Sequence, residues 1–282
     1  MSEKLDQLLT LPQYILPHHL LSKLMFYITR APMGKLTPWL IKQFIKFFKI
    51  NMEEVQHPEP ENYKNFNAFF TRALKPEARP LGEGIISPVD GEISQIGQIN
   101  QRNLFQAKGF EFDLLSLLGG FEPLAGLFEN GQFCTIYLSP KDYHRIHAPV
   151  AGRPIDMAWV PGRLFSVNQR TARQVPNLFA RNERVVTIFK TPVGPMAMIM
   201  VGAIFVGSMD MVWQDGIAPG SGKTPQRWQV PDTMGQFDKG AEVGRFNMGS
   251  TVILLFSKNQ MQWLAHRKPG DVLKMGESLG KY

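Results

Sequence analysis

The spacing of hydrophobic residues changes once along the chain. Up to about residue 61, short segments rich in Leu, Ile and Phe are separated by prolines, and their apolar residues recur at the spacing of one helix face. Beyond Pro80 the apolar residues form short runs bounded by Gly and Pro, at residues 91–99, 132–138, 155–160, 184–190, 196–206 and 251–256. Runs of this kind are typical of β-strands. We therefore predict an α+β protein, in which a β-rich body of hairpin-built antiparallel sheets carries an N-terminal set of amphipathic helices.

Two segments near the N-terminus have the pattern of amphipathic helices. The second is predicted to begin at Thr37 and Pro38, a capping hydroxyl followed by proline at the first helical position. The apolar stripes are Leu20, Leu21, Leu24, Met25 and Ile28 in the first helix, and Leu40, Ile41, Phe44, Ile45 and Phe48 in the second. Such stripes pack against a protein core or lie in a lipid interface. The pattern leaves both open, and the nearby Trp39 and lysines favour lipid.

A proline-rich linker separates this helical part from the rest of the chain. Residues 57–61 have the sequence HPEPE, and residues 65–74, with three phenylalanines, are predicted to form one more short helix. The predicted organisation is therefore a helical region at residues 1–61 and a larger domain at residues 62–282.

The charge of the chain favours anionic partners. Lys and Arg outnumber Asp and Glu by 31 to 24, which gives a net charge of +7. Nucleic acid is not expected, because the β-rich part has no basic tract with interleaved aromatic residues. A spanning helix is not expected either, because the longest uncharged stretch, residues 191–209, is interrupted by Gly and Pro. The start of the chain has no signal-peptide pattern. These observations leave an acidic lipid surface as the favoured partner.

Two familiar motifs are incomplete in this sequence. Residues 220–224 read GSGKT, but a phosphate-binding loop needs glycine five residues before Gly222, and that position is Ile217. No nucleotide cofactor is therefore predicted. Asp90, His147 and Ser250 supply the residue types of a hydrolase triad, yet Ser250 has no glycine two residues away on either side, as a nucleophile elbow requires.

The position of Ser250 indicates a different use of its hydroxyl. The serine directly follows Gly249 at the start of an apolar run, so its hydroxyl can attack the preceding carbonyl, which glycine leaves unhindered. A serine of this kind can cut its own chain. Taken from the residues alone, two alternatives stay open: a triad serine hydrolase acting on lipid, and a non-enzymatic lipid-binding protein.

The segment around Ser250 resembles the processing region of the phosphatidylserine decarboxylases. Residues 240–253 read GAEVGRFNMGSTVI, where the family has Leu-Gly-Ser-Thr or a near variant, so Met248 is a mild departure. The likeness extends over nearly the whole chain, because family-like segments occur in family order at residues 66–72 (FNAFFTR), 87–91 (SPVDG), 143–149 (YHRIHAP), 201–208 (VGAIFVGS) and 274–280 (KMGESLG).

The resemblance implies self-cleavage by a triad that acts on its own chain. Asp90 would orient His147, and His147 would take the proton of the Ser250 hydroxyl as general base. Attack on the Gly249 carbonyl would give an ester, β-elimination would release residues 1–249, and hydrolysis would leave a pyruvoyl group at position 250. The cut at Gly249 and Ser250 would thus divide the larger, catalytic domain and give chains 1–249 and 250–282.

The resemblance also implies the reaction, its cofactor and its location. The pyruvoyl carbonyl would form a Schiff base with phosphatidylserine and accept the electrons left by CO2, giving phosphatidylethanolamine with no metal or nucleotide. His144 is the implied proton donor, and Ser166, in a family-like stretch, is a weaker substrate-binding candidate. The N-terminal helices would hold the enzyme peripherally on anionic membrane, at the cytoplasmic face of the inner membrane. A homodimer is left open.

Overall fold

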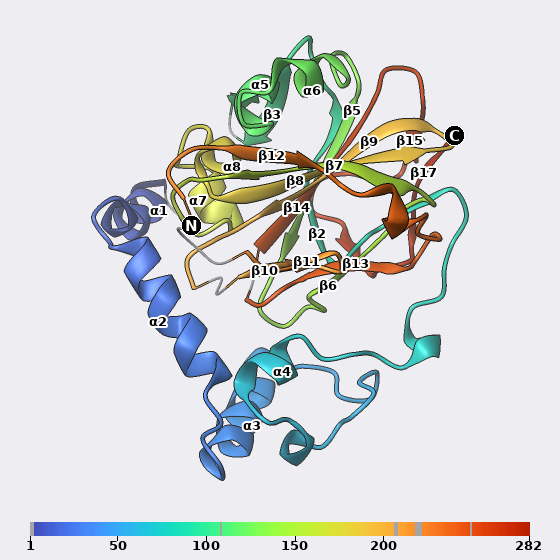
Figure 1. The fold of residues 1–282 in the computed structure, drawn as a ribbon. Helices are drawn as coiled ribbons and strands as arrows, with labels where there is room; N and C mark the ends of the chain where they lie inside the picture. The colour runs from blue at the N-terminus through green and yellow to red at the C-terminus, as the bar shows by residue number, and fades with distance from the viewer. Residues whose placement is uncertain (1–2, 108, 206–207, 218–221, 249) are drawn as a thin grey trace.

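The computed structural model describes residues 3–107, 109–205, 208–217, 222–248 and 250–282. Figure 1 shows a β-rich body with the N-terminal helices along one side of it and below it. The described α-helices are α1 (Glu3–Thr10), α2 (His18–Arg30), α3 (Leu36–Phe48), α4 (Phe66–Phe70), α5 (Leu114–Leu117), α6 (Glu122–Gly126), α7 (Gln169–Ala172) and α8 (Leu178–Arg181). Single 3-10 turns are η1 (Leu11–Tyr14), η2 (Pro60–Asn62), η3 (Pro76–Ala78) and η4 (Asp232–Met234).

The named strands pair antiparallel throughout the described residues, which confirms the predicted α+β class. The largest sheet contains β12 (Gln226–Gln229), β7 (Arg153–Val160), β8 (Arg184–Thr191), β9 (Gly194–Val201), β14 (Ser250–Phe256), β5 (Gln132–Leu138), β2 (Gly91–Gln98) and β16 (Val272–Leu273), in that order. A second sheet has the order β11 (Gln214–Ile217), β10 (Met209–Met211), β13 (Glu242–Phe246) and β6 (Arg145–His147). Smaller groups are β1 (Ile85–Ile86), β17 (Ser278–Lys281) and β15 (Gln262–Trp263), and the hairpin of β3 (Asn103–Ala107) with β4 (Phe110–Asp113).

The centre of the largest sheet is β14, which lies between β9 and β5. Every residue of β14 is buried, as a continuous apolar run predicts for a strand covered on both faces. The six runs picked out by sequence correspond to β2, β5, β7, β8, β9 and β14, although β9 ends at Val201, before the predicted end at residue 206. Ser250 is therefore the first residue of the most enclosed strand.

The second sheet was not predicted, because its strands are short. β6 has three residues, β10 has three and β13 has five, too few for a period-two pattern to be visible. These strands nevertheless place the candidate site, since β6 ends in His147 and β13 pairs with it.

Helix α3 packs its predicted stripe against the protein. Ile41 is buried with Ile50 and Phe69, and the stripe residues Phe44, Ile45 and Phe48 pack around them, whereas Leu40 lies outside this cluster. The predicted start of this helix is wrong: α3 begins at Leu36, and the Thr37 hydroxyl accepts a hydrogen bond from the backbone N–H of Met33 (3.2 Å) in the preceding turn. The short helix that follows, α4, is capped by Asn65 and ends at Phe70, four residues earlier than predicted.

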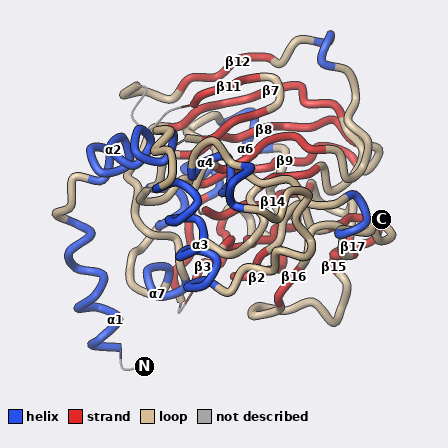
Figure 2. Tube along the Cα trace, turned by 90° about the horizontal axis from the view of Figure 1, so that it is seen from below, coloured by secondary structure: helices blue, strands red, loops and turns tan. Residues whose placement is uncertain are grey.

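Helix α2 has the opposite arrangement. Its buried side chains are the polar His18, Ser22 and Thr29, whereas Leu20 and Leu24 on its predicted stripe are 66% and 54% exposed. Figure 2, seen from below, shows α3 and α4 across the strands, with α1 and α2 at the edge. Among the described residues, no helix is both long and apolar enough to cross a membrane. The described residues thus leave Leu20 and Leu24 on the apolar face of α2 largely uncovered.

The boundary at residue 61 stays a prediction. Ile41 and Ile50 before it share one apolar cluster with Phe69 after it, so α3 packs closely on the segment that opens the larger domain.

Candidate active site

Asp90 lies in the turn before β2 and is held there by an arginine. The Ser87 hydroxyl donates to the Val89 carbonyl (2.7 Å), which closes the turn. Arg79 donates two parallel hydrogen bonds to the Asp90 carboxylate, from Nε (2.9 Å) and Nη2 (2.6 Å), and the backbone N–H of Met275 donates a third (2.8 Å). Because a bidentate guanidinium fixes the geometry of its partner, the Asp90 carboxylate is held rigidly in a buried place.

His147 ends β6 next to the Asp90 turn, since its backbone N–H donates to the Pro88 carbonyl (2.9 Å). Its Nδ1 lies 2.8 Å from the Gly240 carbonyl oxygen, which can only accept, so Nδ1 carries the proton. Its Nε2 therefore has the free lone pair and accepts from the Tyr143 hydroxyl (3.0 Å). Burial lowers the pKa of His147, so the ring is neutral at neutral pH and is a competent base at Nε2.

His144, just before β6, is buried more deeply. Its Nδ1 lies 2.8 Å from the Asp142 carbonyl oxygen, so here too the proton is on Nδ1, and Phe70 packs against the ring at a centroid distance of 4.1 Å. Within the described residues its Nε2 has no hydrogen-bond partner. Burial, with the charge of Arg72, lowers the pKa of His144 to about 3. The imidazole is neutral and presents an unused lone pair.

Ser250 is fully buried opposite Leu138 of β5. Its hydroxyl has no hydrogen-bond partner in the part of the chain that the structure describes. Burying a hydroxyl without a partner costs roughly 1–3 kcal/mol, so a serine is an unfavourable choice here for packing alone. The neighbouring Gly249, the other half of the predicted cleavage site, lies outside the described residues, as does the GS pair of the 220–224 motif.

An apolar cavity of about 330 Å³ adjoins Ser250. We call it the Phe70 cavity, and its walls include Phe70, Leu138, Ser166, Phe205 and Met248. Leu138 pairs with Ser250, and Phe70 packs on His144, so two residues of the cavity wall contact candidate site residues. Ser166 also lines this cavity, and its backbone N–H donates to the side chain of Gln13 (2.8 Å).

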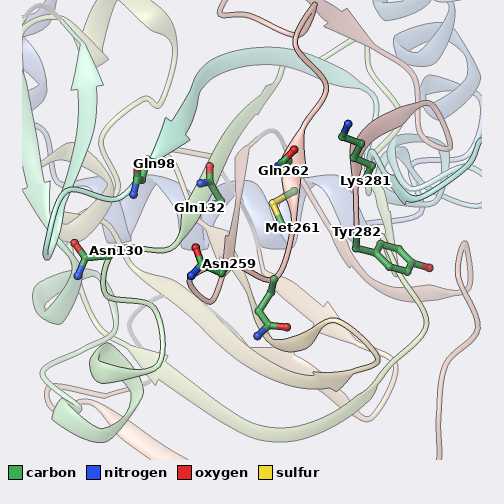
Figure 3. A pocket seen from close by; sticks show the side chains of 9 residues that line it. Gln98, Asn130, Gln132, Asn259, Met261, Gln262, Lys281 and Tyr282 are labelled. Carbon is green, nitrogen blue, oxygen red and sulfur yellow. The ribbon is translucent and has the colours of Figure 1, made fainter.

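A larger cavity lies elsewhere. It measures about 540 Å³ and is lined mainly by amide side chains near the C-terminus, as Figure 3 shows, and no predicted site residue borders it. A polar cavity of about 270 Å³ borders Asp90, Arg79 and Tyr143. The candidate site therefore lies between this polar cavity and the apolar Phe70 cavity.

The structure brings the predicted residues close without linking them in a hydrogen-bonded chain. Asp90 is bonded to Arg79 and Met275, and both ring nitrogens of His147 are bonded to other groups, so the described residues show no direct Asp90–His147–Ser250 relay. The roles given to these residues therefore stay predictions.

Sequence reasoning missed two supporting residues, Arg79 and Tyr143. The sequence around Arg79 does not indicate its role, because its partner Asp90 is eleven residues away. Tyr143 lies four residues before His147 in a segment already picked out, and that spacing was the available clue.

The described side chains suit a group formed from Ser250 itself. An enclosed Ser250 hydroxyl with no partner among the described residues fits a serine that is converted in place. Within the described ranges, no group of three or more His, Cys, Asp or Glu side chains converges as metal ligands would.

A buried serine and two neutral histidines are the main features of this site, with Leu138 and Phe70 connecting Ser250 and His144 to one apolar cavity. Comparison with known proteins identifies the family. The phosphatidylserine decarboxylase family model matches residues 66–281, and a second model, described as PSD, matches residues 8–49. The chain belongs to the phosphatidylserine decarboxylase family, as its motifs predicted.

Curated relatives extend the match to both ends of the chain. The phosphatidylserine decarboxylase proenzyme of Alteromonas mediterranea is 48% identical over 98% of this chain and 86% of its own length. The proenzymes of Psychromonas ingrahamii and Shewanella baltica are 49% and 51% identical, over 97% and 94% of this chain and 96% and 94% of their own lengths. These matches favour the decarboxylase interpretation over a triad hydrolase or a lipid-binding protein.

Proposed function

We propose that the chain is a proenzyme that cuts itself between Gly249 and Ser250 and then decarboxylates phosphatidylserine to phosphatidylethanolamine. The observation that carries the proposal is the buried, unpartnered Ser250 hydroxyl at the start of β14, beside the apolar Phe70 cavity. The family membership supports the reaction, and the relatives' description as proenzymes supports the processing step.

Self-cleavage needs a base for the Ser250 proton, and His147 is the one we assign. It is neutral, and its Nε2 lone pair is available once the Tyr143 hydroxyl turns away. Asp90 is the negative charge in the neighbouring turn, and it favours the imidazolium that forms when His147 takes the proton. The carboxylate keeps its place throughout, because Arg79 and Met275 hold it.

The pyruvoyl group proposed at position 250 supplies an electron sink for the departure of CO2. His144 handles the proton of the substrate. Its Nε2 is unprotonated and has no hydrogen-bond partner among the described residues, so we assign this atom to proton transfer to carbon after CO2 leaves. The apolar walls exclude water from the site and accommodate the lipid end of the substrate.

The proposal is tested by mixing the purified protein with vesicles of phosphatidylserine and phosphatidylcholine. We expect release of CO2 with matching formation of phosphatidylethanolamine, and an intact-mass spectrum with two fragments that meet at residues 249 and 250. A whole chain that reacts with a fluorophosphonate probe and releases fatty acid would instead support the triad hydrolase.

Replacing His144 separates the two reactions. We expect His144→Ala to cut itself but to decarboxylate about 10²–10⁴-fold more slowly, the usual contribution of a general acid or base. Fragment formation by the variant is its own control for folding, because cleavage needs the folded site. Decarboxylation by a cleaved variant at the normal rate would remove His144 from the mechanism.

We further propose that the enzyme binds peripherally to anionic membrane at the cytoplasmic face of the inner membrane, through α1 and α2. The exposed apolar side chains of this part, among them Leu8, Leu20, Leu24 and Tyr27, form the surface that would enter the lipid interface. Basic residues of the same region add attraction to acidic headgroups, about 1 kcal/mol for each Lys or Arg near the surface. The substrate headgroup lies at the same interface.

Charge placed on the apolar face of α2 is expected to weaken membrane binding. The double variant Leu20→Glu, Leu24→Glu removes two exposed leucines, each worth about 1.5–3 kcal/mol when buried, so vesicle affinity should fall at least about tenfold. Co-sedimentation with phosphatidylserine vesicles measures this. Val272→Glu is the matched control, since Val272 is 73% exposed on the edge strand β16. Equal losses in both variants would argue against docking through α2.

A further inference from the structure

The buried face of α2 is hydrogen-bonded to the stretch after β9, and through that stretch it is connected to the segment before Ser250. Ser22 accepts through Oγ from the backbone N–H of Phe205 (3.1 Å), and Arg30 donates from Nη2 to the Ser208 hydroxyl (2.9 Å). Ser22 and Ser208 are almost completely buried. The helix whose outer face is apolar and exposed therefore contacts, through its inner face, the two ends of a short stretch after β9.

The Ser208 hydroxyl is also hydrogen-bonded to Asn247. Asn247 Nδ2 donates to Ser208 Oγ (2.6 Å) and to the Asp210 carboxylate (2.9 Å), and the backbone N–H of Asn247 donates to the Ser208 carbonyl (3.0 Å). A hydroxyl oxygen has two lone pairs, and here one takes the Arg30 bond and the other the Asn247 bond. Ser208 thus joins α2 to a residue only three positions before Ser250.

Helix α4 holds Asn247 from the other side. Asn67 Nδ2 donates to both the carbonyl and the side-chain oxygen of Asn247 (3.1 Å each). Asn65, which caps α4, donates to the Arg30 carbonyl (3.0 Å), so α2 and α4 are themselves joined. Asn247 is 2% exposed, and its side chain is fully occupied by these partners. The approach to the scissile bond is therefore fixed by both helices.

The contact at Phe205 supports a strained backbone. Phe205 has φ +69°, a left-handed conformation that costs a residue with a side chain about 1–3 kcal/mol. Phe205 lines the Phe70 cavity together with Met248 and Ser166. Ser22 thus helps to hold a conformation that shapes the cavity beside Ser250.

We propose that Arg30, Ser208 and Asn247 are positioning residues that couple α2 to self-cleavage, so that docking of α2 on an anionic bilayer accelerates the cut. Docking fixes α2 from its apolar side, and the Arg30–Ser208–Asn247 connection then holds the segment before Ser250 in the geometry for attack. This inference rests on the proposed self-cleavage and on the proposed membrane contact of α2.

The test follows cleavage of freshly synthesised chain by intact mass, with and without vesicles of phosphatidylserine and phosphatidylcholine. We expect the vesicles to raise the rate for the native chain at least threefold. Arg30→Met should cut about tenfold more slowly and lose the response to vesicles, because misplacement by about 1 Å of an attacking group costs up to about 10²-fold. Arg30→Lys, which can still donate to Ser208, should recover part of both.

Lys23→Met is the matched control. It removes one positive charge from the exposed side of the same helix, so it should weaken vesicle binding as much as Arg30→Met while keeping the vesicle response at saturating lipid. Asn247→Asp provides an independent variant, in which the donor to Ser208 is lost and a second carboxylate is placed beside Asp210; it should behave as Arg30→Met does.

The outcomes separate the coupling from the proposals beneath it. A native chain that never cuts contradicts the proposed function, and one that cuts but does not bind vesicles contradicts the membrane contact. If the native chain cuts and binds, but vesicles leave its rate unchanged, the coupling is wrong. If Arg30→Met is slower yet keeps the vesicle response, its effect is one of general stability, and the coupling is again wrong.

Discussion

A Ser250→Ala chain is expected to stay whole, with the full mass of 282 residues, under conditions in which the native chain is cut completely. The side chain that attacks the preceding carbonyl is absent in the variant, and neither ester nor pyruvoyl group can form from alanine. Decarboxylation of phosphatidylserine should fall to the background rate, since no other described residue supplies the electron sink. Intact-mass spectrometry and headgroup analysis of the lipid measure the two losses.

The variant should also fold, because the Ser250 side chain forms no hydrogen bond with the described residues that alanine would lose. Removing an unpartnered buried hydroxyl is expected to leave the stability unchanged or slightly higher. Ser257→Ala, directly after the same strand, is the control and should cut normally. A whole native chain, or a cut Ser250→Ala chain, would each overturn the assignment of Ser250.

Loss of His147 is expected to slow self-cleavage by about 10²–10⁴-fold, the contribution of a general base in proton transfer. His147→Ala removes the Nε2 lone pair and also leaves the Gly240 carbonyl and the Tyr143 hydroxyl without their partner. The measurement is the rate at which full-length precursor disappears. His266→Ala, at an exposed position, should leave that rate unchanged.

The dependence of self-cleavage on pH follows from the same residue. His147 acts as a base only when neutral, and burial lowers its pKa below the ordinary value of 6.5. The rate should therefore be flat above pH 6.5 and should fall in more acidic solution, as the pH passes through the lowered pKa. Folding must be checked in the same range, because the unfolded chain binds protons before the folded one does and stability also declines there. A rate that falls already above pH 6.5, in folded protein, would point to another base.

The strands of the core were predictable because their apolar residues indicate a buried environment. β14 and β5 are runs of buried apolar residues, and no other short segment type accommodates so many branched and aromatic side chains. The second sheet was not predictable, since three-residue strands such as β6 are stabilised by their neighbours and not by their own pattern. Pairing with β13 is a property of the folded chain.

The candidate site was predictable only as far as its motifs. Asp90, His144, His147 and Ser250 were identified because each lies in a segment like those of a known family. The contacts that define their state, such as Arg79 on Asp90 and Gly240 on His147, join residues 11 and 93 positions apart. No local spacing encodes such pairs.

Helix α2 shows that the same hydrophobic stripe can be either buried against the protein or exposed. Its stripe and that of α3 are alike in sequence, yet Ile41 of α3 is buried while Leu20 of α2 is 66% exposed. The clue lay on the other face, where Ser22 and Thr29 are small enough to pack on the body of the protein. Ser22 accepts a hydrogen bond from Phe205, and the Thr29 hydroxyl donates within α2 to the Met25 carbonyl.

The place of Ser250 at the head of β14 determines what kind of molecule the cut would produce. Residues 250–282 contribute β14 between β9 and β5, and also β16 against β2 and β17 against β1. After cleavage the small fragment would therefore remain threaded through the large one, held by backbone ladders on both edges of β14 and by an entirely buried strand. The two pieces could part only by unfolding, so the cut would change the covalent connectivity while the tertiary structure persists. The mature enzyme would be a permanent heterodimer of a long and a short chain, and the two would have folded together as one chain before the cut separated them.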